Sequence, residues 1–296
     1  MTDRTHHRLD ISAGLASVAV AGILVALKLW ALAATGALSV AASLADSALD
    51  LMVSAMGLMA IVYAARPPDE DHSFGHSSAE DLAALAQSVF ITVSACVIGW
   101  AAIRRLLGDT PVVLNAEGRG VAVMAISIML TLALVAWQRS VARRTGSRVV
   151  AADQLHYMGD LLPAFGAILS LAVAGTLGLY SIDSVVALGA AAWLLVGAAR
   201  IGKGAWDALM DRQADPEVIA GIEELARGWP GVHGFHDLKT RMAGRRIFVN
   251  IHIELDGGQT LREAHDIGAG LRRAIMDRYP QADVIIHKDV ARPAAG

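Results

Sequence analysis

Asp153-Gln-Leu-His-Tyr-Met-Gly-Asp160 is the stretch that decides the fold of this chain, because it opens an apolar run that continues to Leu179. Within it, His156 and Asp160 are four residues apart, and on a helix such a pair lies one turn apart on the same face. A lone ionised carboxylate near the centre of a bilayer costs roughly 3 kcal/mol on insertion scales. The stretch therefore predicts a membrane helix whose polar side chains share a common partner.

A second pair with the same spacing, Asp46 and Asp50, lies inside another apolar segment at residues 38–65. The two pairs together supply three carboxylates and one imidazole, and Zn²⁺ prefers four tetrahedral ligands from nitrogen, oxygen or sulfur. A hard ion such as Mg²⁺ would take six oxygens and keep waters. The alternative is that each polar group finds its own hydrogen bond in a helical bundle. We predict a divalent-metal site formed by Asp46, Asp50, His156 and Asp160.

The composition places the chain among membrane proteins. It has 296 residues, of which 55% are hydrophobic and 18% are charged, which is too apolar for an ordinary soluble protein. The formal net charge of -3 implies neither nucleic acid nor an anionic surface as a partner. The single cysteine, Cys96, excludes an intrachain disulfide and a thiolate-rich metal site. No cleavable signal peptide is evident.

Six apolar stretches reach the length of about 20 residues that a transmembrane helix needs. They run over residues 11–34, 38–65, 81–107, 120–142, 149–177 and 184–209. Lysine and arginine gather before the first stretch and between the fourth and fifth, whereas the loops after the first and fifth have none. Since positive residues favour cytoplasmic loops, both termini are expected in the cytoplasm. Arg104, Arg105 and Arg119 count against this orientation but are outnumbered.

The composition changes after Asp211, which indicates a second, soluble domain. Residues 216–228 and 261–279 are expected to form helices, and residues 236–242, 246–255 and 284–288 to form strands, with a turn at Gly244. Asp215 is the expected cap of the first helix. We therefore expect an α-helical membrane domain of six transmembrane helices at 1–212, a cytoplasmic α+β ferredoxin-like domain (αββαβ) at 213–291, and a disordered tail at 292–296.

Potential metal ligands also gather outside the membrane segments. The loop at residues 66–76 contains Asp69, His72 and His76, which taken alone is typical of a solvated acidic loop. In the soluble domain, a period of two places His287 and Asp289 on one face of a strand. Each histidine singly would be a surface residue, but together they indicate a metal cluster drawn from His236, His252, His265, His287 and Asp289.

The ordered set of motifs resembles a known family, the cation diffusion facilitators, and in particular their bacterial zinc-exporting YiiP-like branch. The resemblance rests on the two carboxylate-bearing pairs, the loop His-Ser-Phe-Gly-His, and the soluble segments Trp-Pro-Gly-Val, His-Asp-Leu-Lys-Thr-Arg and Val-Ile-Ile-His-Lys-Asp. It implies a homodimer in the bacterial inner membrane with six transmembrane helices in each copy. It also implies export of a divalent metal in exchange for protons.

The resemblance assigns a role to each group of candidate residues. The paired residues would form the transport site, Asp69, His72 and His76 a loop site, and the soluble cluster a binuclear site. Two positions depart from the relatives. Ser78 stands where they have a lysine that pairs with an aspartate at the position of Asp211, and Lys288 stands where they have glutamine between the last histidine and aspartate.

Secondary active transport, rather than catalysis, is the expected activity. Only the deprotonated forms of the four groups bind a metal, so metal and protons compete for one site and alternating access would give Zn²⁺/H⁺ antiport. His156 is expected to take one of the exchanged protons. Cd²⁺, Fe²⁺, Mn²⁺ and Co²⁺ are further candidate substrates, because affinity order alone does not fix selectivity.

Three other functions stay open on the sequence. An intramembrane metalloenzyme would need an open coordination position and a general base, whereas four ligands close the shell. A membrane-bound metal sensor would signal through its soluble domain without transport. A passive channel is disfavoured by tight four-ligand binding. The cytoplasmic site itself is either a regulatory sensor or a permanent structural clasp.

Overall fold

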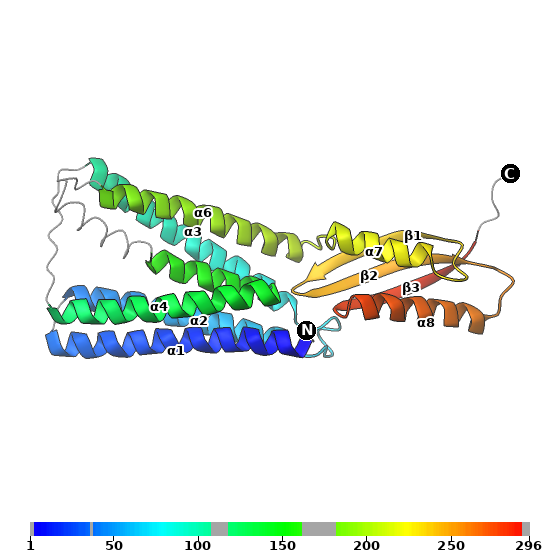
Figure 1. Cartoon of the computed structure of the whole chain (residues 1–296), viewed down its shortest axis with the longest axis horizontal. Helices are drawn as coiled ribbons and strands as arrows, with labels where there is room; N and C mark the ends of the chain where they lie inside the picture. Colours follow the sequence, from blue (N-terminus) through cyan, green and yellow to red (C-terminus); the bar gives the residue numbers. More distant parts are fainter. Residues whose placement is uncertain (1–2, 36–37, 108–117, 162–181, 292–296) are drawn as a thin grey trace. The chain divides into compact units, whose positions relative to one another are not determined.

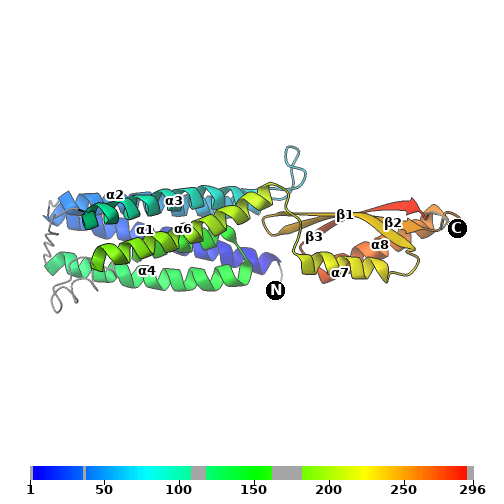
Figure 2. The same cartoon turned by 90° about the horizontal axis from the view of Figure 1, so that it is seen from above.

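The chain divides into two compact units, residues 1–206 and 207–296. The computed structural model describes residues 3–35, 38–107, 118–161 and 182–291. The first unit consists of long helices and the second of a small sheet with two helices (Figures 1 and 2). The expected tail at 292–296 lies outside the described residues.

In its described ranges, the helical unit contains five labelled helices and one further helix at residues 148–161. The labelled ones are α1 (Asp3–Thr35), α2 (Leu38–Ala64), α3 (Ser78–Leu107), α4 (Gly118–Thr145) and α6 (Ile182–Leu209). Each begins within three residues of the predicted stretch except α1, which starts eight residues earlier. The fifth predicted span is described only to residue 161, and the rest of it lies outside the described residues.

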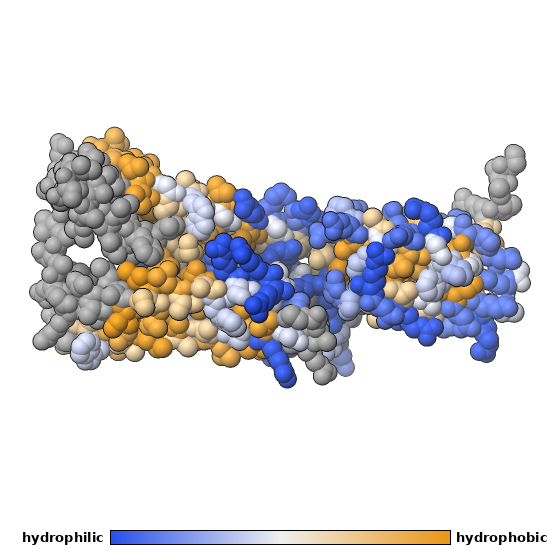
Figure 3. All heavy atoms as spheres, in the orientation of Figure 1, coloured by the Kyte–Doolittle hydropathy of each residue, from blue (hydrophilic) through white to orange (hydrophobic). Residues whose placement is uncertain are grey.

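Four helices in the described ranges are long and apolar enough to cross a membrane. They are Thr5–Ala33, Asp46–Ala64, Ser78–Leu107 and Ser184–Leu209. Large apolar side chains such as Trp30, Trp100 and Trp193 point outward, and hydrophobic residues dominate the helical unit on the face drawn in Figure 3. Continuous helices satisfy their own backbone hydrogen bonds, which is what a bilayer requires.

Small residues let the helices approach one another closely. A Cβ atom built at Gly197 of α6 would lie 2.7 Å from Leu155 Cδ2, and one at Gly14 of α1 would lie 2.9 Å from Leu58 Cδ1. Such contacts leave no room for a larger residue, and close packing of this kind drives helix association in lipid. Helix 148–161 is thereby held against α6.

The second unit has the predicted order αββαβ. Its elements are α7 (Pro216–Arg227), β1 (Gly234–Ala243), β2 (Arg246–Leu255), α8 (Leu261–Arg278) and β3 (Ala282–Val290). The strand order is β1-β2-β3, with β1 antiparallel and β3 parallel to β2. Gly244 forms the β1–β2 turn with a φ of 55°. Asp215 occupies the cap position of α7, but its side chain makes no capping hydrogen bond.

Alternation along β2 separates the two faces of the sheet. Ile247, Val249, Ile251 and Ile253 are buried in a core shared with α7 and α8. Since successive side chains of a strand point to opposite faces, His252 and Glu254 lie on the face that the helices leave open. This open face carries the cytoplasmic metal candidates.

Candidate metal centres

The predicted transport-site residues come from two helices of the first unit. Asp50 on α2 and His156 on helix 148–161 face each other, with 3.0 Å between Asp50 Oδ1 and His156 Nε2. Together with Asp160 they offer ligand atoms that all lie within 4.8 Å of one another. Asp50 and His156 are buried, whereas Asp160 is exposed. Phe90 of α3 packs edge-on against the His156 ring, 5.5 Å away between centroids.

Asp46, the fourth predicted ligand, is not within that group of three. It is exposed and lies one helical turn before Asp50. Its carboxylate still interacts electrostatically with Asp50, His156 and Lys28. The structure therefore brings three of the four predicted residues together and leaves Asp46 at the edge of the site.

A buried polar network beside this site was not predicted from the sequence. The Asp153 carboxylate accepts hydrogen bonds from Ser17 Oγ and Gln138 Nε2, both at 2.6 Å, and from Ser54 Oγ at 3.3 Å. The Tyr157 hydroxyl lies 2.9 Å from Ser54 Oγ. Asp153 is 5% exposed, so these donors supply the partners that a buried carboxylate requires. The network joins α1, α2, α4 and helix 148–161.

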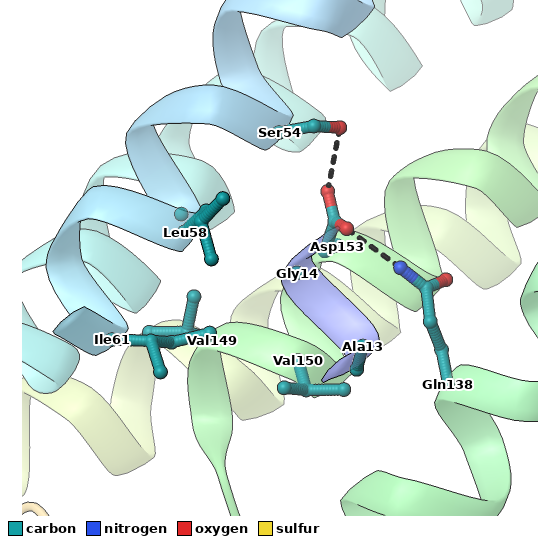
Figure 4. A pocket seen from close by; sticks show the side chains of 10 residues that line it. Ala13, Gly14, Ser54, Leu58, Ile61, Gln138, Val149, Val150 and Asp153 are labelled. Atoms are coloured by element: carbon teal, nitrogen blue, oxygen red, sulfur yellow. Dashed lines mark hydrogen bonds between the residues drawn. The ribbon is translucent and has the colours of Figure 1, made fainter. Parts of the chain in front are cut away.

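Asp153 also lines a small cavity between these helices (Figure 4). Ser54 and Gln138 contribute its polar wall, and the remaining lining is small or apolar: Ala13, Gly14, Gly57, Leu58, Ile61, Val149 and Val150. The sequence contained one signal for this network. Asp153 is a carboxylate within an apolar segment, and it lies seven residues before Asp160, which places both near the same helix face.

The loop between α2 and α3 brings Asp69, His72 and His76, the site that the family resemblance implies, within 4.8 Å of one another. His72 Nδ1 lies 3.3 Å from Asp69 Oδ1, and His76 Nε2 lies 3.3 Å from Asp69 Oδ2. A hydrogen bond from the His72 backbone N–H holds the pKa of the Asp69 carboxyl below its usual range. Gly75, with a φ of 82°, takes the left-handed conformation that glycine adopts readily.

The cytoplasmic cluster is centred on Asp289 of β3. Its Oδ2 lies 2.9 Å from His252 Nδ1 and 3.3 Å from His236 Nε2, and its Oδ1 lies 3.2 Å from His287 Nε2. The hydrogen bond with His252 holds the pKa of the Asp289 carboxyl below its usual range. One carboxylate surrounded by three imidazoles is a donor set that suits a transition metal such as Zn²⁺.

Strand register places these histidines side by side. His236 pairs with His252, and His252 pairs with His287, so the three form a row across the sheet. A register shift follows His236, and Asp237 there has a φ of 49°. Irregularities of this kind can change the direction of a side chain next to a functional site, and here the shift interrupts the regular ladder directly beside the metal candidates.

Three further residues singled out in the sequence lie in the second unit. His265 is exposed on α8, which packs on the opposite face of the sheet from the cluster, so a single chain does not bring it to Asp289. Lys288 faces α8, since a Cβ at Gly268 would lie 2.6 Å from Lys288 Cε. Asp211 pairs with Arg241 Nη1 at 3.2 Å.

Both units of the chain match domains of a known protein family. Residues 14–210 match the cation efflux transmembrane domain and residues 214–290 match the cation efflux protein cytoplasmic domain. The cation-efflux pump FieF of Escherichia fergusonii is 39% identical over 287 residues, covering 97% of this chain and 95% of that protein. That of Cronobacter sakazakii is 40% identical over 282 residues, covering 95% and 93%.

Among solved structures, the chain is similar to the metal-bound C-terminal domain of the CzcD transporter from Thermotoga maritima. It is 25% identical to this chain, covers 26% of it and 92% of that domain, and gives a TM-score of 0.25. The family matches and the near full-length relatives decide the identity: this chain belongs to the cation efflux family, the cation diffusion facilitators.

Proposed function

We propose that this chain exports divalent metal ions from the bacterial cytoplasm across the inner membrane, with Zn²⁺ as the main substrate and protons as the counter-ions. Membership of the cation efflux family supports divalent cation efflux. The observation that carries the proposal is the convergence of Asp50, His156 and Asp160 between two helices of the membrane domain. Asp46 is the fourth ligand in this proposal.

The donor set favours Zn²⁺ over harder ions. Two ligand atoms bound to a tetrahedral zinc at about 2.0–2.1 Å lie ~3.3 Å apart, and the separation between Asp50 Oδ1 and His156 Nε2 is 3.0 Å. A metal therefore fits between them with a small opening of the pair. The mixed nitrogen and oxygen donors also suit Cd²⁺, Fe²⁺, Mn²⁺ and Co²⁺.

Proton exchange follows from the same ligands. Carboxylate and imidazole bind a metal only when deprotonated, so a site that alternates between the two sides of the membrane carries either a metal or protons. Export of the metal is then driven by proton entry. Both termini lie in the cytoplasm in this proposal, as the distribution of lysine and arginine predicts.

The cytoplasmic domain is proposed to bind metal in a homodimer. His236, His252, His287 and Asp289 would hold the ion on the open face of one sheet. Because α8 covers the opposite face, His265 would join the site from a second copy of the chain. Asp69, His72 and His76 would form a separate site in the loop.

Flux through reconstituted vesicles tests the proposal. Purified chain in liposomes that contain a Zn²⁺-sensitive dye should carry Zn²⁺ at a rate that rises with an imposed pH difference. Asp50→Ala should abolish this flux, whereas Glu217→Ala, which removes an exposed carboxylate of α7, should leave it intact. Flux that survives Asp50→Ala, or that ignores the pH difference, would contradict the proposal.

A further inference from the structure

A lysine inside the membrane domain is not among the proposed metal ligands. Lys28 lies within the span Thr5–Ala33 of α1, seven residues before the end of that helix. At 1.5 Å per residue this is about 10 Å from the helix end. An ionisable side chain at such a position is costly in lipid and indicates a functional site with a definable partner.

The side chain of Lys28 turns toward α2 rather than toward the end of its own helix. Its ammonium donates a hydrogen bond of 2.6 Å to Ser47 Oγ, and Ser47 is 1% exposed. A lysine that merely snorkels extends its ammonium to the water at the membrane surface. The contact with a buried hydroxyl on a neighbouring helix excludes that description for this side chain.

Ser47 places the ammonium at the transport site. It follows Asp46 directly and precedes Asp50 by three residues on α2. The charge of Lys28 acts on the carboxylates of both Asp46 and Asp160, which are the two exposed members of the predicted ligand set. An ammonium has three donors and no lone pair, so Lys28 cannot itself be a ligand.

We infer that Lys28 sets the metal affinity of the transport site: its ammonium, anchored on Ser47, repels the bound divalent ion and keeps that ion exchangeable. This rests on the proposed function of the site. Three carboxylates and an imidazole without an opposing charge would hold a divalent ion tightly, and a transporter must also release it. In a medium of low dielectric a fixed positive charge acts strongly on a divalent ion nearby.

The direction of the effect distinguishes this role from a structural one. Loss of a merely structural lysine would disturb the site and weaken metal binding. Loss of a repelling charge would strengthen binding and slow release. Lys28→Met keeps the aliphatic stem and removes the charge, Lys28→Arg keeps the charge, and Ser47 can still donate to a backbone carbonyl one turn earlier.

The experiment is calorimetric titration of Zn²⁺ into the full-length chain in detergent at pH 8. The background carries His72→Ala, His76→Ala, His236→Ala and His252→Ala, so that the transport site dominates the signal. Lys28→Met should lower the dissociation constant by about tenfold or more, whereas Lys28→Arg should stay within about twofold of the parent. Lys203→Met, which removes a lysine of α6 outside the predicted metal sites, should leave the constant unchanged.

Flux in vesicles supplies the second measurement. Lys28→Met should reach half-maximal flux at a lower Zn²⁺ concentration and have a lower maximal rate, because release becomes slow. Weaker or unchanged binding in Lys28→Met, or equal effects of Met and Arg, would overturn the inference. A parent chain that binds no Zn²⁺ in the four-alanine background would overturn the proposed function itself.

Discussion

His156 Nε2 lies 3.0 Å from Asp50 Oδ1, and the two residues are 106 positions apart in the chain. An imidazole on one helix and a carboxylate on another thus meet inside the membrane domain. Each has another predicted metal ligand on its own helix: Asp160 lies one turn after His156, and Asp46 lies one turn before Asp50. The site depends on the packing of α2 against helix 148–161 as much as on the four side chains.

The pH dependence of transport should change when the imidazole is removed. Histidine is the side chain whose charge ordinarily changes near neutral pH, so His156→Asp should keep metal binding but shift the pH profile of Zn²⁺ flux between pH 6 and 8. The measurement is initial flux in vesicles at fixed metal and varied internal and external pH. An unchanged profile would show that His156 does not carry an exchanged proton.

The buried carboxylate of Asp153 should be important for stability. Asp153→Asn keeps the shape but places an amide NH₂ where three donors converge, which leaves a buried hydrogen bond unmade at a cost of about 1–3 kcal/mol. The melting temperature of the detergent-solubilised chain should fall by several degrees. Gln138→Met, which removes one donor and leaves Ser17 and Ser54, should cause a smaller fall. Equal melting of Asp153→Asn and the parent would contradict this account.

Asp289 should control metal binding by the cytoplasmic domain without controlling transport chemistry. Asp289→Asn removes the negative charge that lies beside His236, His252 and His287, so Zn²⁺ affinity at this cluster should fall by roughly 10–100-fold. Titration of residues 207–296 as a fragment measures it. Asp283→Asn, an exposed change on the same strand, is the control and should bind as the parent does.

The cytoplasmic unit should fold as this fragment, because its core contains its own buried residues from β2, β3, α7 and α8. Thr260 caps α8 by accepting a hydrogen bond from the Glu263 backbone N–H, and the Glu263 side chain accepts one from the Thr260 N–H. Thr260→Ala should therefore lower the free energy of unfolding by about 1 kcal/mol, as measured by urea denaturation. Unchanged stability would show that the cap does not contribute.

The same cap predicts a dependence on pH. The hydrogen bond from the Thr260 backbone N–H holds the pKa of the Glu263 carboxyl below its usual range. A carboxyl with a lowered pKa in the folded state stabilises the fold above its unfolded pKa, about 4.3, and loses this effect as the pH falls through the folded value. Glu263→Gln should thus be less stable than the parent at pH 7, and the difference should shrink as the pH falls through the lowered pKa of the Glu263 carboxyl. A difference that stays constant as the pH is lowered would exclude this origin.

Local periodicity explains what the sequence could predict. The alternation along residues 247–255 and the glycine at 244 determine the hairpin, and the spacing of four between paired ligands places them on helix faces. The network around Asp153 could not be predicted, because Ser17 and Gln138 follow no pattern and lie 136 and 15 residues away. The position of His265 could not be predicted either, because tertiary packing and not the local sequence decides which face of the sheet α8 covers.

Asp215, the expected cap of α7, also shows what local sequence cannot predict. The residue type and position were right, but its side chain makes no hydrogen bond to the helix. Pro216 at the first helical position favours a helix start, because its φ is already close to the helical value and its missing N–H is one that the helix would leave unbonded. Residue type thus indicated where α7 begins, but not which bonds hold its end.

The uneven exposure of the four proposed transport-site ligands has a kinetic consequence. Asp50 and His156 are buried in the bundle, whereas Asp46 and Asp160 are exposed. If these four residues bind the metal as proposed, an arriving cation would exchange its hydration waters first for the outer carboxylates and then for the inner pair. The barrier for dehydration would then be divided into several smaller steps, which would favour rapid turnover.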